Sequence, residues 1–195
     1  MAAVFNVNFD FGGSDGTPGT EQNTDGLGPP NVRMKTADDA TIDSTNPIPI
    51  PPSGTRRSFW KQLYLYCATA PSTQVDNVKF YTDGGGFGTG ITLYVGEQFP
   101  TKNSGSDAGY EVAAGTVGQD GDEMVANHGG ITSKADAFSF TSGSPLSGPS
   151  ISEAGNIIDA IGETTNYIVV QMDVADTASP GDLTDETMTF QYDEI

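Results

Sequence analysis

Basic residues are scarce in this sequence. Eight Lys and Arg stand against 26 Asp and Glu, which gives a formal net charge of −18. Nucleic acids are bound by clustered Lys and Arg, and here the field of the whole chain would repel phosphate groups. The charge balance therefore argues against nucleic-acid binding and favours a basic partner.

Cysteine and long apolar runs are nearly missing as well. Cys67 stands alone, so no disulfide can form within the chain, and its alternation with Leu63 and Leu65 predicts a small buried core residue. No apolar run approaches the roughly 20 residues that span a bilayer. Residues 1–13 have neither a basic start nor an unbroken apolar core. We therefore expect no signal peptide, no membrane partner, and synthesis in a cytoplasm.

Glycine, in contrast, is abundant, at 25 of 195 residues. Glycine supplies the positive φ angles that tight turns need. Between the glycines, short apolar runs alternate with polar residues. In residues 4–11, for example, Phe5, Val7 and Phe9 fall on one side of a predicted strand. This composition predicts many strands joined by turns.

The pattern along the chain predicts an all-β fold: an antiparallel β-sandwich, jelly-roll-like, with an extended N-terminal arm and long loops. We expect residues 1–57 to form an N-terminal strand plus a Gly/Pro-rich arm, and residues 58–195 to form the β-sandwich domain. Residues 12–30 are predicted to be an irregular loop. The further strand candidates are 31–36, 58–69, two strands in 77–96 that form a hairpin around a glycine-rich tip, 109–117, 136–140, 166–174 and 186–194, and the weak helix candidates are 122–130 and 152–161, the second capped by Ser152.

Signals for catalysis are weak. Ser14 lies in GGSDG, which fits the G-x-S-x-G pattern around a hydrolase nucleophile. The residues that follow Ser14, DGTPGT, cannot begin the helix that such a site needs. His128 is the only histidine, and neither a nucleophile nor an orienting partner can be placed beside it. The sequence predicts a protein that is not an enzyme, and no catalytic residue is assigned.

Aspartates gather in the predicted loops. Calcium takes several oxygen ligands at short spacing, but no complete EF-hand or nonapeptide pattern is present. We therefore expect no cofactor and assign no metal ligand, with structural calcium left open as the alternative to solvated turn carboxylates. The clusters are Asp15 and Asp25, Asp38 and Asp39, and Asp120, Asp122 and Glu123.

The strand at 58–69 is apolar on both sides. Leu63 and Leu65 mark one face, and Trp60, Tyr64 and Tyr66 mark the other. A strand of this kind is covered on both faces. The cover of the aromatic face is packing within the chain, a neighbouring subunit or a sugar stacked on the rings, and alternation alone does not decide between them.

The preceding stretch, TNPIPIPPSGTRRSFWK at residues 45–61, combines prolines with three basic residues. Proline segments start extended and lose little entropy on ordering, so they lie well along a partner surface. We interpret the stretch as a docking arm in which Arg56 and Arg57 meet acidic groups, either on a copy of this protein or on a scaffold. The predicted interface residues are Pro47, Pro49, Pro51, Arg56, Arg57, Trp60, Lys61, Tyr64 and Tyr66.

Three stretches carry a resemblance to a known group of proteins: NPIPIPPSGTRRSFWKQLYL, NVKFYTDGGGFGTG and the closing SPGDLTDETMTFQYDEI. In texture they resemble β-rich accessory proteins, of head decoration or of neck and tail, from tailed phages and archaeal tailed viruses. The resemblance implies a non-enzymatic virion protein, made in the host cytoplasm, that assembles as a homo-oligomer, on the major capsid protein, or both. The alternative is a carbohydrate-binding or adhesin-type β-sandwich module that binds a sugar on Trp60, Tyr64 and Tyr66.

Overall fold

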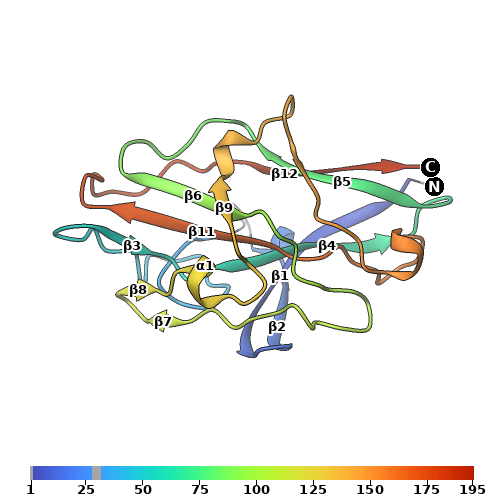
Figure 1. Ribbon diagram of the computed structural model, residues 1–195, viewed down its shortest axis with the longest axis horizontal. Helices are drawn as coiled ribbons and strands as arrows, with labels where there is room; N and C mark the ends of the chain where they lie inside the picture. Colours follow the sequence, from blue (N-terminus) through green and yellow to red (C-terminus); the bar gives the residue numbers. More distant parts are fainter. Residues whose placement is uncertain (1, 28–31) are drawn as a thin grey trace.

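The computed structural model describes residues 2–27 and 32–195, and this part of the chain is built almost entirely from β-strands and loops (Figure 1). Every pair of neighbouring strands recorded in it is antiparallel. The predicted all-β sandwich is confirmed. Helix is confined to short turns, because Gly, Asn and Thr fill the segments between apolar runs. These turns are α1 (Met124–Asn127), η1 (Thr24–Gly26), η2 (Ala137–Ser139) and η3 (Ala154–Asn156).

The larger sheet has seven strands in the order β2-β1-β4-β11-β6-β9, with β3 pairing to the far end of β11. Its middle is apolar on both faces, which is why the sequence of its central strands alternates so little between apolar and polar residues. The strands are β1 (Val4–Ser14), β2 (Thr17–Asn23), β3 (Thr55–Arg57), β4 (Lys61–Thr69), β6 (Ile91–Gly96), β9 (Lys134–Asp136) and β11 (Ile168–Ala175).

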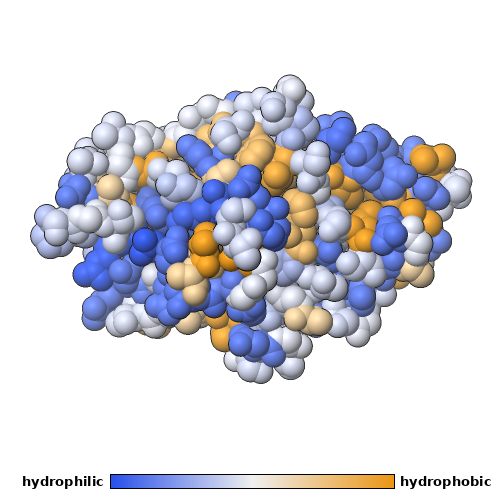
Figure 2. All heavy atoms as spheres, in the orientation of Figure 1, coloured by the Kyte–Doolittle hydropathy of each residue, from blue (hydrophilic) through white to orange (hydrophobic). Residues whose placement is uncertain are grey.

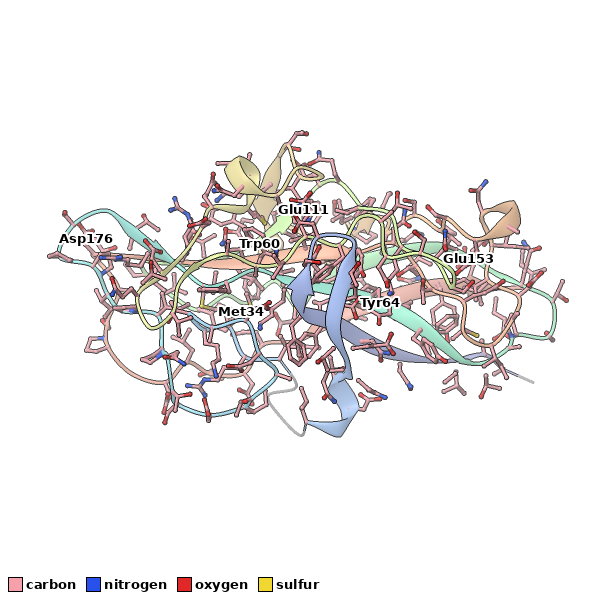
Figure 3. All side chains as sticks on the ribbon, turned by 90° about the horizontal axis from the view of Figure 1, so that it is seen from below. Met34, Trp60, Tyr64, Glu111, Glu153 and Asp176 are labelled. Atoms are coloured by element: carbon pink, nitrogen blue, oxygen red, sulfur yellow. The ribbon has the colours of Figure 1, made fainter. Side chains whose placement is uncertain are left out.

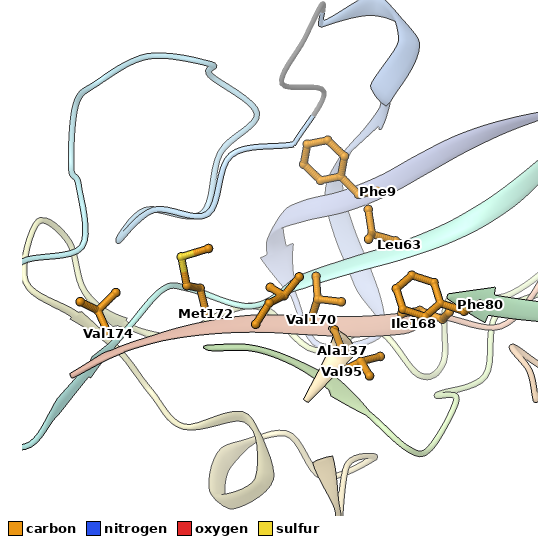
Figure 4. Packing of buried hydrophobic residues seen from close by; sticks show 10 residues of the cluster. Phe9, Leu63, Phe80, Val95, Ala137, Ile168, Val170, Met172 and Val174 are labelled. Atoms are coloured by element: carbon orange, nitrogen blue, oxygen red, sulfur yellow. The ribbon is translucent and has the colours of Figure 1, made fainter. Parts of the chain in front are cut away.

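The smaller sheet covers one face of the larger one. It consists of β10 (Leu146–Ser147), β5 (Val75–Thr82) and β12 (Met188–Glu194) in that order. Phe80 of β5 packs with Leu63 of β4 and Ile168 of β11 in the main core cluster (Figure 4). In the same view, Met172 and Val174 continue this apolar side of β11 beyond Phe80. A separate two-stranded ribbon is formed by β7 (Gly115–Thr116) and β8 (Asp120–Gly121).

The opposite face of the larger sheet is covered by the long connection between β6 and β9. Tyr110, Met124 and Ile131 from this connection pack with Trp60 and with Tyr64 of β4. The molecule therefore has three layers: the smaller sheet, the larger sheet, and a layer of ordered loop. The two faces of residues 58–69 that the sequence separated are both buried within the chain.

The N-terminal region is part of the sandwich. Strand β1 lies between β2 and β4, and β3 pairs with β11, so the larger sheet crosses the predicted boundary at residue 57. The predicted irregular loop at residues 12–30 is wrong over its first half, because residues 12–23 form the turn and return strand of a hairpin. A Cβ added at Gly13 would lie 2.3 Å from the carbonyl oxygen of Thr17, so this pairing requires glycine.

Several local predictions were wrong for identifiable reasons. The two strands in 77–96 do not form a hairpin, since β5 and β6 belong to different sheets and the glycine-rich loop crosses between them. The described residues 32–36 form no strand, and residues 137–139 form η2 instead of continuing a strand. The helix expected at 152–161 is limited to η3, because Gly155 takes a φ of 78° and Ser152 caps nothing.

Candidate functional site: an apolar groove beside the proline segment

The aromatic residues predicted to form a binding face are mostly inside the protein. Trp60 is 2% exposed and Tyr64 is fully buried, while Tyr66 is half-buried. The indole N–H of Trp60 donates a hydrogen bond to the backbone oxygen of Glu111 at 3.0 Å. Figure 3 shows Trp60 and Tyr64 in the middle of the molecule. The prediction of an open aromatic surface is wrong, because the loop layer of the same chain occupies it.

The three basic residues of the predicted docking arm also have partners within the chain. Lys61 is buried, and its ammonium group donates to the backbone oxygen of Asp39 at 2.8 Å; burial lowers the pKa of Lys61. Arg56 pairs with Asp120 at 3.4 Å, and Arg57 pairs with Asp173 at 3.7 Å. Arg56 and Arg57 hold β3 on the sandwich through these pairs, and Lys61 lies inside the protein, which corrects the expectation that it faces another subunit.

The proline segment, residues 45–54, lies along the edge of the sandwich with alternating orientation. Ile48 and Ile50 pack against the main core cluster, whereas Pro47 and Pro49 are exposed. Pro51, another predicted interface residue, is buried. The extended backbone that proline favours explains the path, and the two isoleucines explain why the segment stays on the protein. The segment therefore presents one surface to its own core and another to solvent.

An apolar groove of about 530 Å³ opens beside this segment. Its floor is formed by Ile91 and Leu93 of β6 and by Met172 and Val174 of β11. These are the neighbouring strands of the larger sheet, at the place where the smaller sheet no longer covers them. The proline segment and Val32–Met34 form one wall, and the loop at 178–186 forms the other. The glycine-rich loop places Phe87 at the groove, where its ring meets Phe138 edge to face at 5.5 Å.

The rim of the groove is acidic. Asp182 and Asp185 are exposed, and Glu186 lies beside Asp83. Desolvation and the neighbouring carboxylate of Asp83 raise the pKa of Glu186. Arg33 is the basic residue of the lining, and it is held across the groove by Asp182 at 3.4 Å. An apolar floor under a negatively charged rim is suited to an apolar ligand that carries positive charge.

A buried polar network lies on the loop-layer side of the larger sheet. The carboxylate of Asp10 accepts hydrogen bonds from the hydroxyls of Tyr64, at 3.1 Å, and Tyr167, and pairs with Lys102 at 3.3 Å. Burial raises the pKa of Asp10, and the ammonium of Lys102 opposes that shift. Sequence reasoning missed this network. The polar residues that alternate with phenylalanine in residues 4–11 were its only signal.

Ser14, His128 and Cys67, which the sequence singled out as weaker candidates, each have a defined place in the structure. Ser14 is the exposed last residue of β1 and leads into a hairpin turn, so the strand-to-helix turn of the hydrolase motif is absent there. His128 is 2% exposed, with Nε2 at 2.9 Å from Oε1 of Gln62 and Nδ1 at 3.5 Å from Glu111. Burial lowers the pKa of His128. Cys67 is buried, as predicted.

The acidic clusters do not converge on a common point in the described structure. Within residues 2–27 and 32–195, no group of three or more His, Cys, Asp or Glu side chains is arranged to hold a metal ion. Asp120 instead pairs with Arg56, and Asp39 pairs with Lys35 at 3.1 Å. In the same part of the chain, no helix has the length and apolar character needed to cross a bilayer.

A scan of protein-family models and searches of curated proteins and of solved structures found no match to this chain.

Proposed function

We propose that the protein is a non-enzymatic structural protein of a virion, a capsid decoration or cement protein that binds a neighbouring subunit through the groove. The observation that carries this proposal is the groove itself, an apolar hollow open to solvent and walled by the proline segment. The rest of the surface is mixed, and Figure 2 shows hydrophobic residues in small patches between hydrophilic ones on the face that it displays. Contiguous apolar hollows on such a surface mark binding sites.

The resemblance of three stretches to accessory proteins of tailed viruses supports the virion assignment. All three stretches contribute directly to the groove: residues 47–50 form part of one wall, Phe87 of the glycine-rich loop is part of the lining, and residues 179–188 contain most of the other wall. The three-layered fold suits a subunit that has to be rigid, because both faces of its central sheet are covered. The major capsid protein is the favoured partner over a second copy, since two chains of net charge −18 repel each other.

The sugar-binding alternative required Trp60, Tyr64 and Tyr66 as a flat stacking platform. Trp60 and Tyr64 are buried under the loop layer, so their rings are not accessible to a sugar. No other observation favours that function over docking to a protein.

The test is whether the protein is a stoichiometric component of virus particles. Particles from the source culture are purified on a density gradient and analysed by quantitative mass spectrometry and by immunogold labelling with an antibody against this chain. We expect the protein to band with the particles at a fixed ratio to the shell protein and to be labelled on their surface. Its absence from particles, or its presence only in the unassembled fraction, would overturn the proposal.

A further inference from the structure

We propose that the occupant of the groove is an extended apolar segment of a partner protein, flanked by Lys or Arg. This inference rests on the proposed function, because it names the chemistry of the partner that the groove would bind. The volume of about 530 Å³ is within the range of sites that enclose drug-sized ligands, and is therefore sufficient for several apolar side chains. Leu93, Met172 and Val174 form a floor with no charged group.

The charge of the flanking residues follows from where this chain places its own cations. Six of its eight Lys and Arg residues form ion pairs within the chain, and Lys61 is buried on a backbone oxygen. Lys79, the eighth, lies on β5 and is not part of the groove. The rim therefore stays acidic: Asp185 is exposed, Glu186 is half-buried, and Asp182 pairs with Arg33, which is the one basic residue of the lining. Complementary charge on the partner would speed association and orient the segment.

The mode of binding follows from the proline wall. Pro47, Pro49, Pro51 and Pro52 have no backbone N–H, so along this wall only Ile48 and Ile50, between the prolines, can donate backbone hydrogen bonds to an added strand. The occupant is held mainly by side chains that enter the groove, as in the recognition of extended segments by grooves lined with apolar residues.

A second copy of this chain does not supply such a segment. No large apolar residue that is exposed in the described structure is next to Lys or Arg in the sequence, and several have acidic neighbours. Ile161 lies between Asp159 and Glu163, and Ile195 follows Glu194. The remaining exposed large apolar residues are Val4, Val117 and Leu183. Charge complementarity therefore favours a different, basic partner.

The test is a selection from a random 12-residue peptide library on the immobilised full-length protein, followed by affinity measurements on individual peptides in about 150 mM salt. Each peptide is measured on wild-type protein and on two variants. Asp185→Lys with Glu186→Lys reverses the rim, and Leu183→Glu places a charge on the exposed part of the apolar wall. Asp25→Lys with Glu97→Lys makes the same change in net charge at exposed residues away from the groove, and serves as the matched control.

We expect selected peptides to have an apolar centre and a net positive charge. Their affinity should fall at least roughly tenfold on the rim variant, because like charges repel, and by a similar factor on the Leu183→Glu variant, because docking would bury a charge. The control variant should bind within about twofold of wild type. Circular dichroism and thermal unfolding of each variant establish that the fold is intact, and neither Asp185, which is exposed, nor Glu186, which is half-buried, belongs to the buried core.

Four results would overturn the inference. These are the recovery of no peptide that binds wild-type protein, the enrichment of neutral or acidic peptides, equal loss of affinity on the control, and unchanged affinity on both groove variants. Self-association of wild-type protein that Leu183→Glu abolishes would identify a second copy as the occupant and also refute it. The proposed function is tested separately. If the protein is present on particles but no peptide binds through the groove, only the inference is refuted. If the protein is absent from particles, the proposed function is refuted, whatever the peptide measurements show.

Discussion

Asp10 illustrates how a buried carboxylate is kept in an acidic protein. Its side chain is removed from water by the layer of loop over β1, and the hydroxyls of Tyr64 and Tyr167 and the ammonium of Lys102 replace the lost solvent. The ammonium also lies over the Tyr64 ring, 4.3 Å from its centroid. A buried ion pair of this kind adds little to stability by itself, but its removal leaves a charge without a partner.

Replacing Lys102 with Met should therefore lower the free energy of unfolding by about 3–5 kcal/mol, because Asp10 would remain buried and unpaired. Lys79→Met is the matched control, since Lys79 forms no ion pair within the described residues, and its effect should stay below about 1 kcal/mol. Urea unfolding followed by tryptophan fluorescence measures both. Equal effects of the two changes would contradict the description of the network.

His128 should make stability depend on pH. Burial lowers its pKa in the folded state from 6.5, although Glu111 and Asp15 act in the opposite direction. The unfolded chain then binds a proton at this ring more readily than the folded protein does. The contribution of neutral His128 is fully present above about pH 6.5, and it is lost as the pH falls through that value toward the folded-state pKa.

The measurement is urea unfolding at pH 7.5 and 5.5 for wild type and His128→Gln. We expect the loss of stability between the two pH values to be larger in wild type. Asp10, Asp38 and Asp173, whose pKa values burial raises, titrate in both proteins and cancel in the comparison. The same pH dependence in both proteins would show that the ring is not buried in its neutral form.

Arg56 and Arg57 differ in exposure, so reversing the charge of each should lower the free energy of unfolding by different amounts. Arg57 pairs with Asp173, whose side chain is 14% exposed, whereas Arg56 and Asp120 are each about one-third exposed. Arg57→Glu should lower the free energy of unfolding by on the order of 2 kcal/mol, and Arg56→Glu by less than about 1 kcal/mol. Thermal unfolding of the two single variants checks this order. The reverse order would place Arg57 in solvent.

At the scale of elements, the proline segment is held against the β-sandwich of its own chain. Ile48→Ala and Ile50→Ala should each lower the free energy of unfolding by about 1–2 kcal/mol, since both side chains pack on the core although neither is fully buried. Pro49→Ala, on the exposed side, should change it by less than about 1 kcal/mol. Deletion of residues 45–57 also removes β3 from β11, so we expect that variant to unfold. Wild-type stability after both isoleucine changes would mean that the segment is loosely held.

Elements with strong alternation could be predicted from the sequence. The two faces of β4 were separated correctly because Leu63 and Tyr64 point to opposite sides of the larger sheet. Strand β12 was found because Met188, Phe190 and Tyr192 alternate with polar residues, and β11 was found because Ile168–Val170 form a short apolar run. The return strand β2 was missed because Thr17–Asn23 contains Pro18 and Gly19 and no large apolar residue, so its pairing comes from its neighbour and the turn.

The candidate site could not be predicted in the same way. Local patterns do not show which strands cover one another, so the crossing from β5 to β6 was mistaken for a hairpin tip. The groove depends on that crossing and on the distant loop at 178–186, which meets the proline segment only in the folded protein. The proline segment lines the groove, and the basic residues that follow it, Arg56 and Arg57, pair with acids of the same chain.

At the scale of the whole molecule, most Lys and Arg side chains are paired within the fold. The acidic residues that remain, which carry the net negative charge, lie largely at the surface. Mutual repulsion among these carboxylates destabilises the compact state, and salt screens it. The melting temperature should therefore rise by about 2–5 °C between 10 and 500 mM NaCl. The same rise in the presence of EDTA would separate screening from the binding of calcium. A melting temperature that falls with salt would show that internal ion pairs dominate.

The ends of the described chain lie next to each other, far from the groove. The backbone N–H of Ala3 donates to the carboxylate of Glu194 at 3.1 Å, and Phe5 meets Tyr192 with ring centroids 4.8 Å apart. Both ends are at the right of Figure 1, whereas β11 runs to the left, where the groove wall at 178–186 continues from it. A fluorescent protein or a biotin tag joined to either end would therefore sit on the side opposite the groove. A short linker between the two ends would allow the chain to be reopened at an exposed turn such as Asp15–Gly16, with every other strand connection kept.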